Sequence, residues 1–296
     1  MLERVEAIIQ QLVNEVDFPQ ASELFATLSG GKRLRARLIL TIAPNDSRAP
    51  LLGAIVELIH AASLLHDDVI DEAMMRRGTP SVNATHGSKL AIMLGDILYS
   101  KAFSELTSFD PEISFSISQS VMKLSVGEMM DVAMAESFNV NREEYLKMLY
   151  LKTATLIESC AYCAAILENK EAARYGLYGK NLGLAFQIVD DILDITSDDE
   201  TLGKPALNDF VEGKATLPYI DLYDALDGDE RDKLVGCHGR ELSKAEKVWI
   251  RDRMEHFGVI ERSYHYAQEL CDEAIRCVPE EAALRAIIAS VIQRSY

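Results

Sequence analysis

The amino-acid sequence predicts an all-α protein. Apolar residues recur at spacings of three and four along most of the chain, which is the period of a helix that buries one face. The chain holds only 8 prolines, and none lies between Pro111 and Pro205 or between Pro218 and Pro279, so these stretches can remain helical. No alternating apolar run is bounded by hairpin signals, as paired strands would require.

Turn-forming residues separate the expected helices along the chain. In order, the breaks in helical periodicity fall at 29–31, 44–50, 76–87, 110–111, 139–141, 197–218, 227–229 and around 279. With 296 residues, 48% of them hydrophobic, the chain can build a large core. Neither a Gly/Ser linker nor a repeat of fixed period interrupts it. We therefore predict a single domain over residues 1–296.

Two of these segments should be central helices. Residues 53–71 and 177–195 are apolar on most faces, which is typical of helices surrounded by others. Each ends in the same pattern of acids, with LLHDDVID at 64–71 and QIVDDILD at 187–194. Carboxylates that emerge from buried helices are costly unless a cation compensates them.

Charge and the distribution of apolar residues limit which partners the protein can bind and where in the cell it can lie. The formal net charge of -17 repels polyphosphate backbones and argues against nucleic-acid binding. The opening residues, MLERVEAIIQQLV, lack the basic start and apolar run of a signal peptide, so we expect a cytoplasmic protein. No run approaches the roughly 20 uninterrupted apolar residues of a membrane span, so we expect no such span.

The aspartate clusters predict a magnesium site. Asp67, Asp68 and Asp71 stand at i, i+1 and i+4, so Asp67 and Asp71 share one helix face, and residues 190–194 repeat this spacing. The second cluster contains no histidine, and hard, oxygen-seeking cations suit carboxylates. Mg²⁺ is bound through one or two carboxylates and completes its shell with waters and phosphate oxygens. This predicts that Mg²⁺ holds a diphosphate between two helices.

Basic residues gather beside glycine turns in this otherwise acidic chain. The sequence GGKRLR at 30–35 places three cations after a glycine turn, and Arg76 and Arg77 follow the first aspartate cluster. Arginine pairs bidentately with phosphate oxygens. These groups predict a site for a second anion, with ordinary surface charge as the alternative.

Taken in this order, the motifs resemble those of the all-trans polyprenyl diphosphate synthase family over nearly the whole chain. The matching motifs are GGKRLR at 30–35, LLHDD-VID-RRG at 64–78, Gly127 with Glu128, Lys152 with Thr153, FQIVDDILD at 186–194, Gly203 with Lys204, and GKATLP at 213–218. The resemblance implies a bundle of about a dozen helices around a central cavity, of the isoprenoid synthase type. It also implies a homodimer, and an enzyme that joins isopentenyl diphosphate to an allylic diphosphate.

The resemblance further implies roles for individual residues. Direct magnesium ligands would be Asp67, Asp71 and Asp190, while the acids that hold metal-bound waters or orient neighbours would be Asp68, Asp191 and Asp194. The isopentenyl diphosphate pocket would contain Lys32, Arg35, His60 and Arg77. The allylic diphosphate would contact Arg76 and the catalytic side chains Lys152, Thr153, Gln187, Lys204 and Lys214. For His60, a core histidine bonded to backbone is an equal alternative.

Other classes of protein compete with this interpretation. His66 and Asp67 form an HD pair as in metal-dependent phosphohydrolases, and a di-iron bundle is conceivable, but both need further histidines at metal spacing. A terpene cyclase would normally lack the second cluster and the GGKRLR site. A silent subunit of a heteromeric synthase should have lost a cluster. Leu207 departs from the family, many of whose members have glycine there, which leaves the conformation of that loop open.

Small residues before the first cluster predict a long product. Ala62 and Ser63 lie five and four residues before Asp67, where short-chain members of the family resemble each other in carrying a bulky aromatic. A growing tail that runs from the aspartates into the core would be stopped by such a ring, because packed interiors do not yield cheaply. We predict a hexaprenyl to octaprenyl chain. The alternatives are a short-chain synthase making farnesyl or geranylgeranyl diphosphate, and small residues that merely permit close helix packing.

Overall fold

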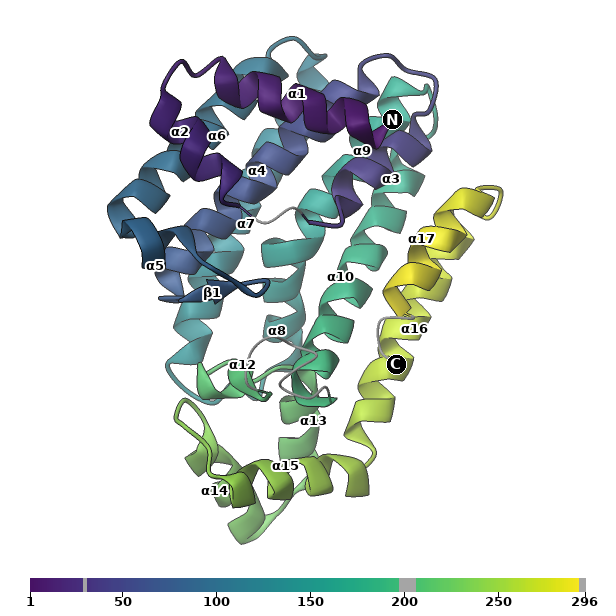
Figure 1. Cartoon of the computed structure of the whole chain (residues 1–296). Coiled ribbons are helices and arrows are strands. Elements are labelled where there is room, and N and C mark those ends of the chain that lie inside the picture. Colours follow the sequence, from purple (N-terminus) through teal and green to yellow (C-terminus); the bar gives the residue numbers. More distant parts are fainter. Residues whose placement is uncertain (29–30, 197–205, 293–296) are drawn as a thin grey trace. The chain divides into compact units, whose positions relative to one another are not determined.

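Helices make up most of the computed structural model, which describes residues 1–28, 31–196 and 206–292 (Figure 1). The predicted all-α class is therefore confirmed. In chain order the helices are α1 (Leu2–Asn14), α2 (Pro19–Ala26), α3 (Leu34–Ile42), α4 (Ala49–Ile70), α5 (Val82–His86), α6 (Ser88–Leu106), α7 (Pro111–Ala135), α8 (Arg142–Leu149), the π-helix η1 (Tyr150–Ala154), α9 (Thr155–Leu167), α10 (Ala172–Thr196), α12 (Asn208–Val211), α13 (Leu217–Ala225), α14 (Gly228–Cys237), α15 (Lys244–His256), α16 (Val259–Cys277) and α17 (Ala282–Ile292).

A small hairpin that the sequence did not predict follows α4. Strand β1 (Met75–Arg76) pairs antiparallel with β2 (Thr79–Pro80), with Arg76 opposite Thr79. The two residues between them, Arg77 and Gly78, have φ angles of 51° and 76°. A two-residue loop with both φ values positive is the type I′ turn that fits strand twist. Strands of two residues are too short to show alternation in a sequence.

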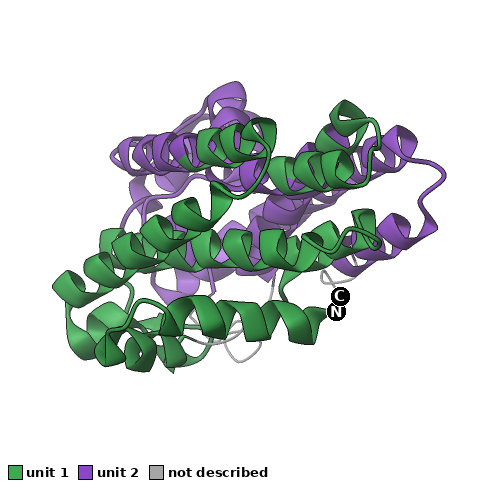
Figure 2. Cartoon of the chain, turned by 90° about the horizontal axis from the view of Figure 1, so that it is seen from above, with its two compact units in different colours: residues 1–121, 158–176 green, residues 122–157, 177–296 purple. Residues whose placement is uncertain are grey.

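The chain divides into two compact units (Figure 2), unit 1 with residues 1–121 and 158–176, and unit 2 with residues 122–157 and 177–296. In unit 1, α4 packs against α1, α3 and α6 (Figure 1). Every residue of α4 from Leu52 to Ile59 is buried, so the helix has buried residues on all faces there. This confirms the prediction of a central helix. The single domain over 1–296 stays a prediction.

Unit 2 has an aromatic and aliphatic core beside the loop that precedes α13. The rings of Phe210 and Tyr219 stack with centroids 4.1 Å apart and planes 4° apart, and both side chains are fully buried. The cluster also includes residues of α14 and α15, among them Leu234 and Ile250. Aromatic pairs of this kind add to the stabilisation that burial gives.

Helix caps account for where several helices begin. Asn141 Oδ1 accepts hydrogen bonds from the backbone N–H groups of Glu143 and Glu144, each 3.1 Å long, at the start of α8. Ser243 and Glu246 form a reciprocal capping box at the start of α15. Such caps satisfy N–H groups that have no partner within the helix.

One described helix, α4, is long and apolar enough to cross a membrane by length and composition. However, 67% of its most apolar window is buried inside the structure, as in the core helix of a soluble protein. The absence of a membrane span therefore stays a prediction.

Candidate active site

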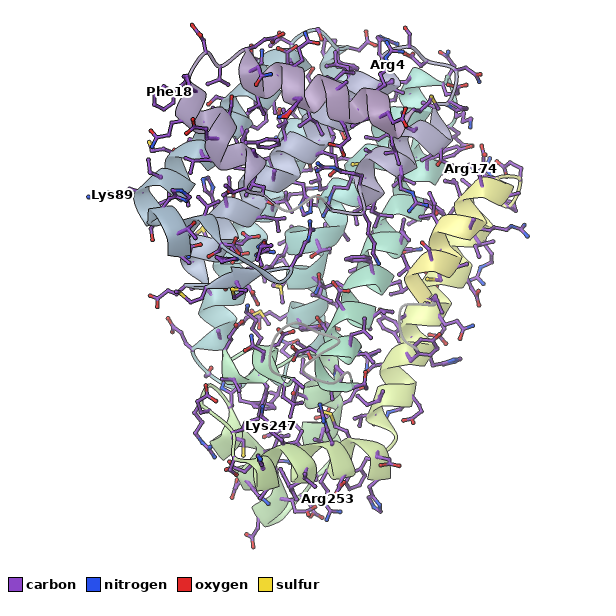
Figure 3. The ribbon with its side chains drawn as sticks, viewed as in Figure 1. Arg4, Phe18, Lys89, Arg174, Lys247 and Arg253 are labelled. Carbon is purple, nitrogen blue, oxygen red and sulfur yellow. The ribbon has the colours of Figure 1, made fainter. Side chains whose placement is uncertain are left out.

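Two arginines of unit 1 hold strained backbone conformations beside each other. Arg33, the residue before α3, has φ 50°, and Arg77 in the hairpin turn has φ 51°. A left-handed conformation costs a non-glycine residue about 1–2 kcal/mol, and strain of this kind is typical of functional sites. A Cβ atom built on Gly31 would lie 2.7 Å from Arg77 Nη1, so the glycine leaves room for that guanidinium. Cations elsewhere, such as Arg4 and Lys89, are simply exposed on their helices (Figure 3).

A buried acid organises this basic cluster. Glu57 of α4 is only 3% exposed, accepts a 3.1 Å hydrogen bond from the Ala36 backbone N–H, and pairs with Arg33 Nη1 at 3.4 Å. One oxygen thus caps the first turn of α3, where the helix dipole favours negative charge, and the other orients an arginine. Sequence reasoning missed Glu57. A lone acid within the apolar run AIVELIH was the available signal.

Arg35 and His60 lie together in the same cluster. Arg35 Nε is buried and has no hydrogen-bond partner among the described residues, and burial lowers the pKa of Arg35 although Glu57 opposes the shift. Burial, followed by Arg35 and Arg77, lowers the pKa of His60 well below its usual value, so its imidazole is neutral near pH 7. A guanidinium whose buried Nε has an unused donor favours an anionic ligand. Lys32, by contrast, is exposed.

The first aspartate motif occupies the C-terminal end of α4. Asp68 is buried and accepts a 2.6 Å hydrogen bond from Arg76 Nε, and burial raises the pKa of Asp68 although Arg76 opposes the shift. Asp67 and Asp71 are only partly buried, and Asp71 is the C-terminal cap of the helix. The negative end of the helix dipole adds to the repulsion between these two carboxylates. A cation bound there would relieve both.

The residues predicted to set chain length lie one turn earlier on α4. Ala62 is fully buried, and Ser63 is partly buried with its Oγ donating to the His60 carbonyl at 2.9 Å. The serine hydroxyl is therefore satisfied by its own helix and presents little bulk beyond it.

The three acids of the second aspartate motif, on α10 in unit 2, differ in burial and in hydrogen-bond partners. Asp190 is partly buried. Asp191 is buried and accepts hydrogen bonds from Tyr145 OH and, at 3.1 Å, from Gln187 Nε2. Burial, followed by the charge of Asp209, raises the pKa of Asp191 well above its usual value. Asp194 is buried as well, and its Oδ2 accepts from the Asp209 backbone N–H at 3.2 Å.

Asp194 and a buried leucine shape the described part of the following loop. The Leu207 N–H donates to the Asp194 carbonyl at 2.8 Å, and Leu207 has φ 63° with a fully buried side chain. Burying a leucine yields about 1.5–3 kcal/mol, which offsets the cost of the left-handed conformation. This explains how leucine occupies a position where glycine is common. Lys204 lies outside the described residues.

A π-helix carries Lys152 and Thr153. The five residues of η1 interrupt the run from α8 to α9, and such insertions are frequent at functional sites. A Cβ atom on Gly127 would lie 2.3 Å from the Lys152 backbone nitrogen, and one on Gly183 would lie 2.6 Å from Ala154 Cα. Two glycines therefore allow neighbouring helices to clamp the π-helix closely. Sequence reasoning noted Gly127 only as part of a motif, and it missed Gly183.

Two acids surround Lys152. Its Nζ atom lies 2.5 Å from Asp131 and 2.9 Å from Glu128. Burial would lower the pKa of Lys152, but the two carboxylates outweigh it and raise the pKa above its usual value. Lys214 is close enough for its charge to oppose that rise, so the structure brings together two of the predicted catalytic lysines. Thr153 Oγ1 donates to Gln187 Oε1 at 3.0 Å, which unites two more predicted residues.

Within the described parts of the chain, no three His, Cys, Asp or Glu side chains form a group able to hold a metal ion. The donor chemistry is nevertheless suitable. Asp67 and Asp71 offer carboxylate oxygens from adjacent turns of one helix, and Mg²⁺ usually takes only one or two protein carboxylates, the remainder being water and phosphate.

Comparisons with known proteins agree with these features. A family model described as polyprenyl synthetase matches residues 20–252. A short chain isoprenyl diphosphate synthase from Methanothermobacter thermautotrophicus is 34% identical over 302 residues, covering 96% of this chain and 91% of that protein. The octaprenyl pyrophosphate synthase structure from Helicobacter pylori has a TM-score of 0.94 and 39% identity, covering 100% of this chain and 98% of that one.

A further solved structure is a polyprenyl synthase from Caulobacter crescentus complexed with calcium and isoprenyl diphosphate. Its TM-score is 0.88 and its identity 28%, with 100% of this chain and 95% of that chain covered. The chain belongs to the polyprenyl synthetase family, whose members generally use a divalent metal. Its particular activity is that of a trans-polyprenyl diphosphate synthase, a prenyltransferase, so the resemblance seen in the sequence is confirmed.

Proposed function

We propose that this prenyltransferase uses Mg²⁺ to condense isopentenyl diphosphate with an allylic diphosphate, and that it releases a long-chain all-trans polyprenyl diphosphate suited to a quinone side chain. The observation that carries the long-chain assignment is the pair of small residues, Ala62 and Ser63, one turn before Asp67. Similar proteins include a short-chain and an octaprenyl synthase. Family membership therefore does not determine the product length, which we infer from the residues of this chain.

The proposed metal ligands are Asp67, Asp71 and Asp190, the partly buried members of the two motifs. When bound, Mg²⁺ would neutralise charge on the diphosphate oxygens and make diphosphate a better leaving group. The buried acids Asp68, Asp191 and Asp194 have protein hydrogen bonds, which supports a role in orienting neighbours.

The chain's own residues would do the rest. Lys152, Lys204 and Lys214 are proposed to hold the allylic diphosphate as its C–O bond breaks. Arg76, Thr153 and Gln187 are proposed as further contacts of the same diphosphate. Lys32, Arg35, His60 and Arg77 are proposed to hold isopentenyl diphosphate, whose double bond attacks the cation and forms the new C–C bond. The released diphosphate can take the proton that is then lost.

Steady-state kinetics with each substrate varied in turn tests this two-substrate map. Arg35→Ala should raise the KM for isopentenyl diphosphate about 10- to 100-fold, because a charge-assisted hydrogen bond contributes about 1.5–3 kcal/mol. Lys214→Ala should instead raise the KM for the allylic primer. An equal rise in the KM for the same substrate in both variants would show that the map is wrong. Prenyl transfer by the wild type without Mg²⁺ would contradict the metal assignment.

Chromatography of the products tests the chain length. Wild type should make hexaprenyl to octaprenyl products, whereas Ala62→Tyr and Ser63→Phe should shorten them, because an aromatic ring in a packed core cannot be displaced cheaply. In the wild type, a deeper wall near Ile59 or residues 117–124 would set the stop. A control, Ala225→Phe at the end of α13, should leave product length unchanged. A wild type that stops at farnesyl or geranylgeranyl diphosphate would establish the short-chain alternative.

We also propose that the enzyme is a cytoplasmic homodimer with no membrane span. Support for an interface comes from one face of α7, where Met122, Val126, Met129 and Val132 recur at helical spacing and are each at least 43% exposed. Exposed apolar stripes of this kind often mark protein contacts. Sedimentation equilibrium giving the monomer mass at micromolar concentration would contradict the dimer.

A further inference from the structure

We propose that Tyr145 is a positioning residue that fixes the second aspartate motif through Asp191. The inference rests on the proposed function, in which Asp190 is a metal ligand, and it adds a residue from α8 that no motif of the sequence singled out. All of the contacts that carry it lie within unit 2.

The hydroxyl group of Tyr145 connects three elements. Tyr145 is 1% exposed, and its OH donates to Asp191 Oδ2 on α10. The backbone of Leu217, the first residue of α13 and three residues after Lys214, lies close enough to lower the pKa of Tyr145 against the larger effect of burial, which raises it. The buried hydroxyl is therefore bonded to the aspartate helix and lies beside the segment that carries a predicted catalytic lysine.

The other oxygen of Asp191 continues the chain of hydrogen bonds. Gln187 Nε2 donates to Asp191 Oδ1 at 3.1 Å, and Gln187 Oε1 accepts from Thr153 Oγ1 of the π-helix at 3.0 Å. Both carboxylate oxygens of Asp191 thus have a protein donor, which suits an anchor better than a metal ligand. Asp191 and Gln187 are four residues apart, on one face of α10.

Fixing Asp191 fixes Asp190. Successive helical residues are separated by a constant rotation, because a helix has 3.6 residues per turn, so anchoring one side chain sets the direction of its neighbour. Polar partners behind a metal ligand commonly change metal affinity or activity 10- to 100-fold when removed. The anchoring hydroxyl of Tyr145 is expected to act in this way.

The test compares removal of the Tyr145 hydroxyl with removal of the hydroxyl of another buried tyrosine. Tyr145→Phe keeps the ring and deletes the donor. Tyr178→Phe is the control, since Tyr178 is also fully buried in unit 2 and its OH donates to the Leu284 carbonyl at 2.9 Å. It lies about three turns before Asp190 on α10. The readouts are the melting temperature, kcat, the KM for isopentenyl diphosphate, and the Kd of inorganic pyrophosphate measured by calorimetry in Mg²⁺.

Both variants should lose similar thermal stability. Only Tyr145→Phe should lower kcat and raise the Kd of pyrophosphate by about 10- to 100-fold, with the KM for isopentenyl diphosphate unchanged. The inference is overturned if the wild type is active and Tyr145→Phe has the same kcat and the same Kd of pyrophosphate as Tyr178→Phe. A wild type without magnesium-dependent prenyl transfer would instead overturn the proposed function.

A second pair of variants keeps the inference testable even if Tyr145→Phe does not fold. Asp191→Asn retains an oxygen that accepts a hydrogen bond from Tyr145. If Asp191 is an anchor, this variant should lower kcat only about tenfold, near the lower end of the effects seen when a residue that positions a metal ligand is changed. Asp190→Asn should cost far more. Equal losses in the two variants would show that Asp191 acts through its charge and not as an anchor.

Discussion

Asp67→Ala and Asp190→Ala should each lower turnover by about 10³-fold, because stabilisation of the leaving diphosphate by a metal is worth several kcal/mol and each 1.36 kcal/mol is tenfold in rate. Turnover is measured with saturating substrates over a range of Mg²⁺ concentrations. Asp252→Ala, which removes an exposed acid from α15, is the matched control and should retain full activity.

Neither substitution should unfold the protein. Asp67 and Asp71 stand one turn apart at the negative end of α4, so deleting one carboxylate removes repulsion as well as contacts. Melting temperatures are expected to stay within a few degrees of wild type, because substitutions of charged residues near the surface usually change the free energy of unfolding only slightly. Activity close to wild type in either folded variant would refute the metal assignment.

Gly127→Ala and Gly183→Ala should lower kcat by about 100-fold, because displacing a catalytic backbone by about 1 Å has effects of that size. The added methyl group would meet backbone atoms of η1 at 2.3 Å and 2.6 Å, and these cannot rotate away as a side-chain end can. Overpacking of this kind also costs about 1–3 kcal/mol of stability, which thermal denaturation measures.

The control for this pair is Gly236→Ala in α14. Gly236 is exposed, and a Cβ atom there would meet nothing within 4 Å among the described residues. An alanine should raise stability by about 0.8–1.0 kcal/mol through helix propensity and leave kcat unchanged. Full activity in Gly127→Ala together with Gly183→Ala would show that the π-helix does not need the close approach of its neighbours.

Helical periodicity was sufficient to predict the class of fold, and motif order was sufficient to predict the family. Both signals are read along the chain and do not depend on which segments meet in space. Apolar spacing along 53–71 reports a helix buried on most faces, and the structure places residues 52–59 of α4 entirely inside unit 1. The hairpin at Met75–Pro80 was not predicted, because strands of two residues carry no periodic pattern.

Side-chain partnerships across distant segments could not be read from the chain. Glu57 meets Arg33 and Ala36, 24 and 21 residues away, and Tyr145 meets Asp191 across 46 residues. A sequence shows the composition of each segment but not which turn of one helix faces which turn of another. The same limit hid the role of Gly183, whose meaning depends on the backbone of Ala154 beside it.

The amino-acid order alone therefore defined an all-helical chain, two aspartate motifs and the types of residue that bind diphosphates, because these follow from spacing and side-chain chemistry. Folding in three dimensions decided which acids are anchored and which remain partly exposed. Asp191 and Asp190 are neighbours with identical side chains, yet only Asp191 is buried against Tyr145 and Gln187. Burial and hydrogen bonding depend on what packs against each face of a helix, and that is a property of the whole fold.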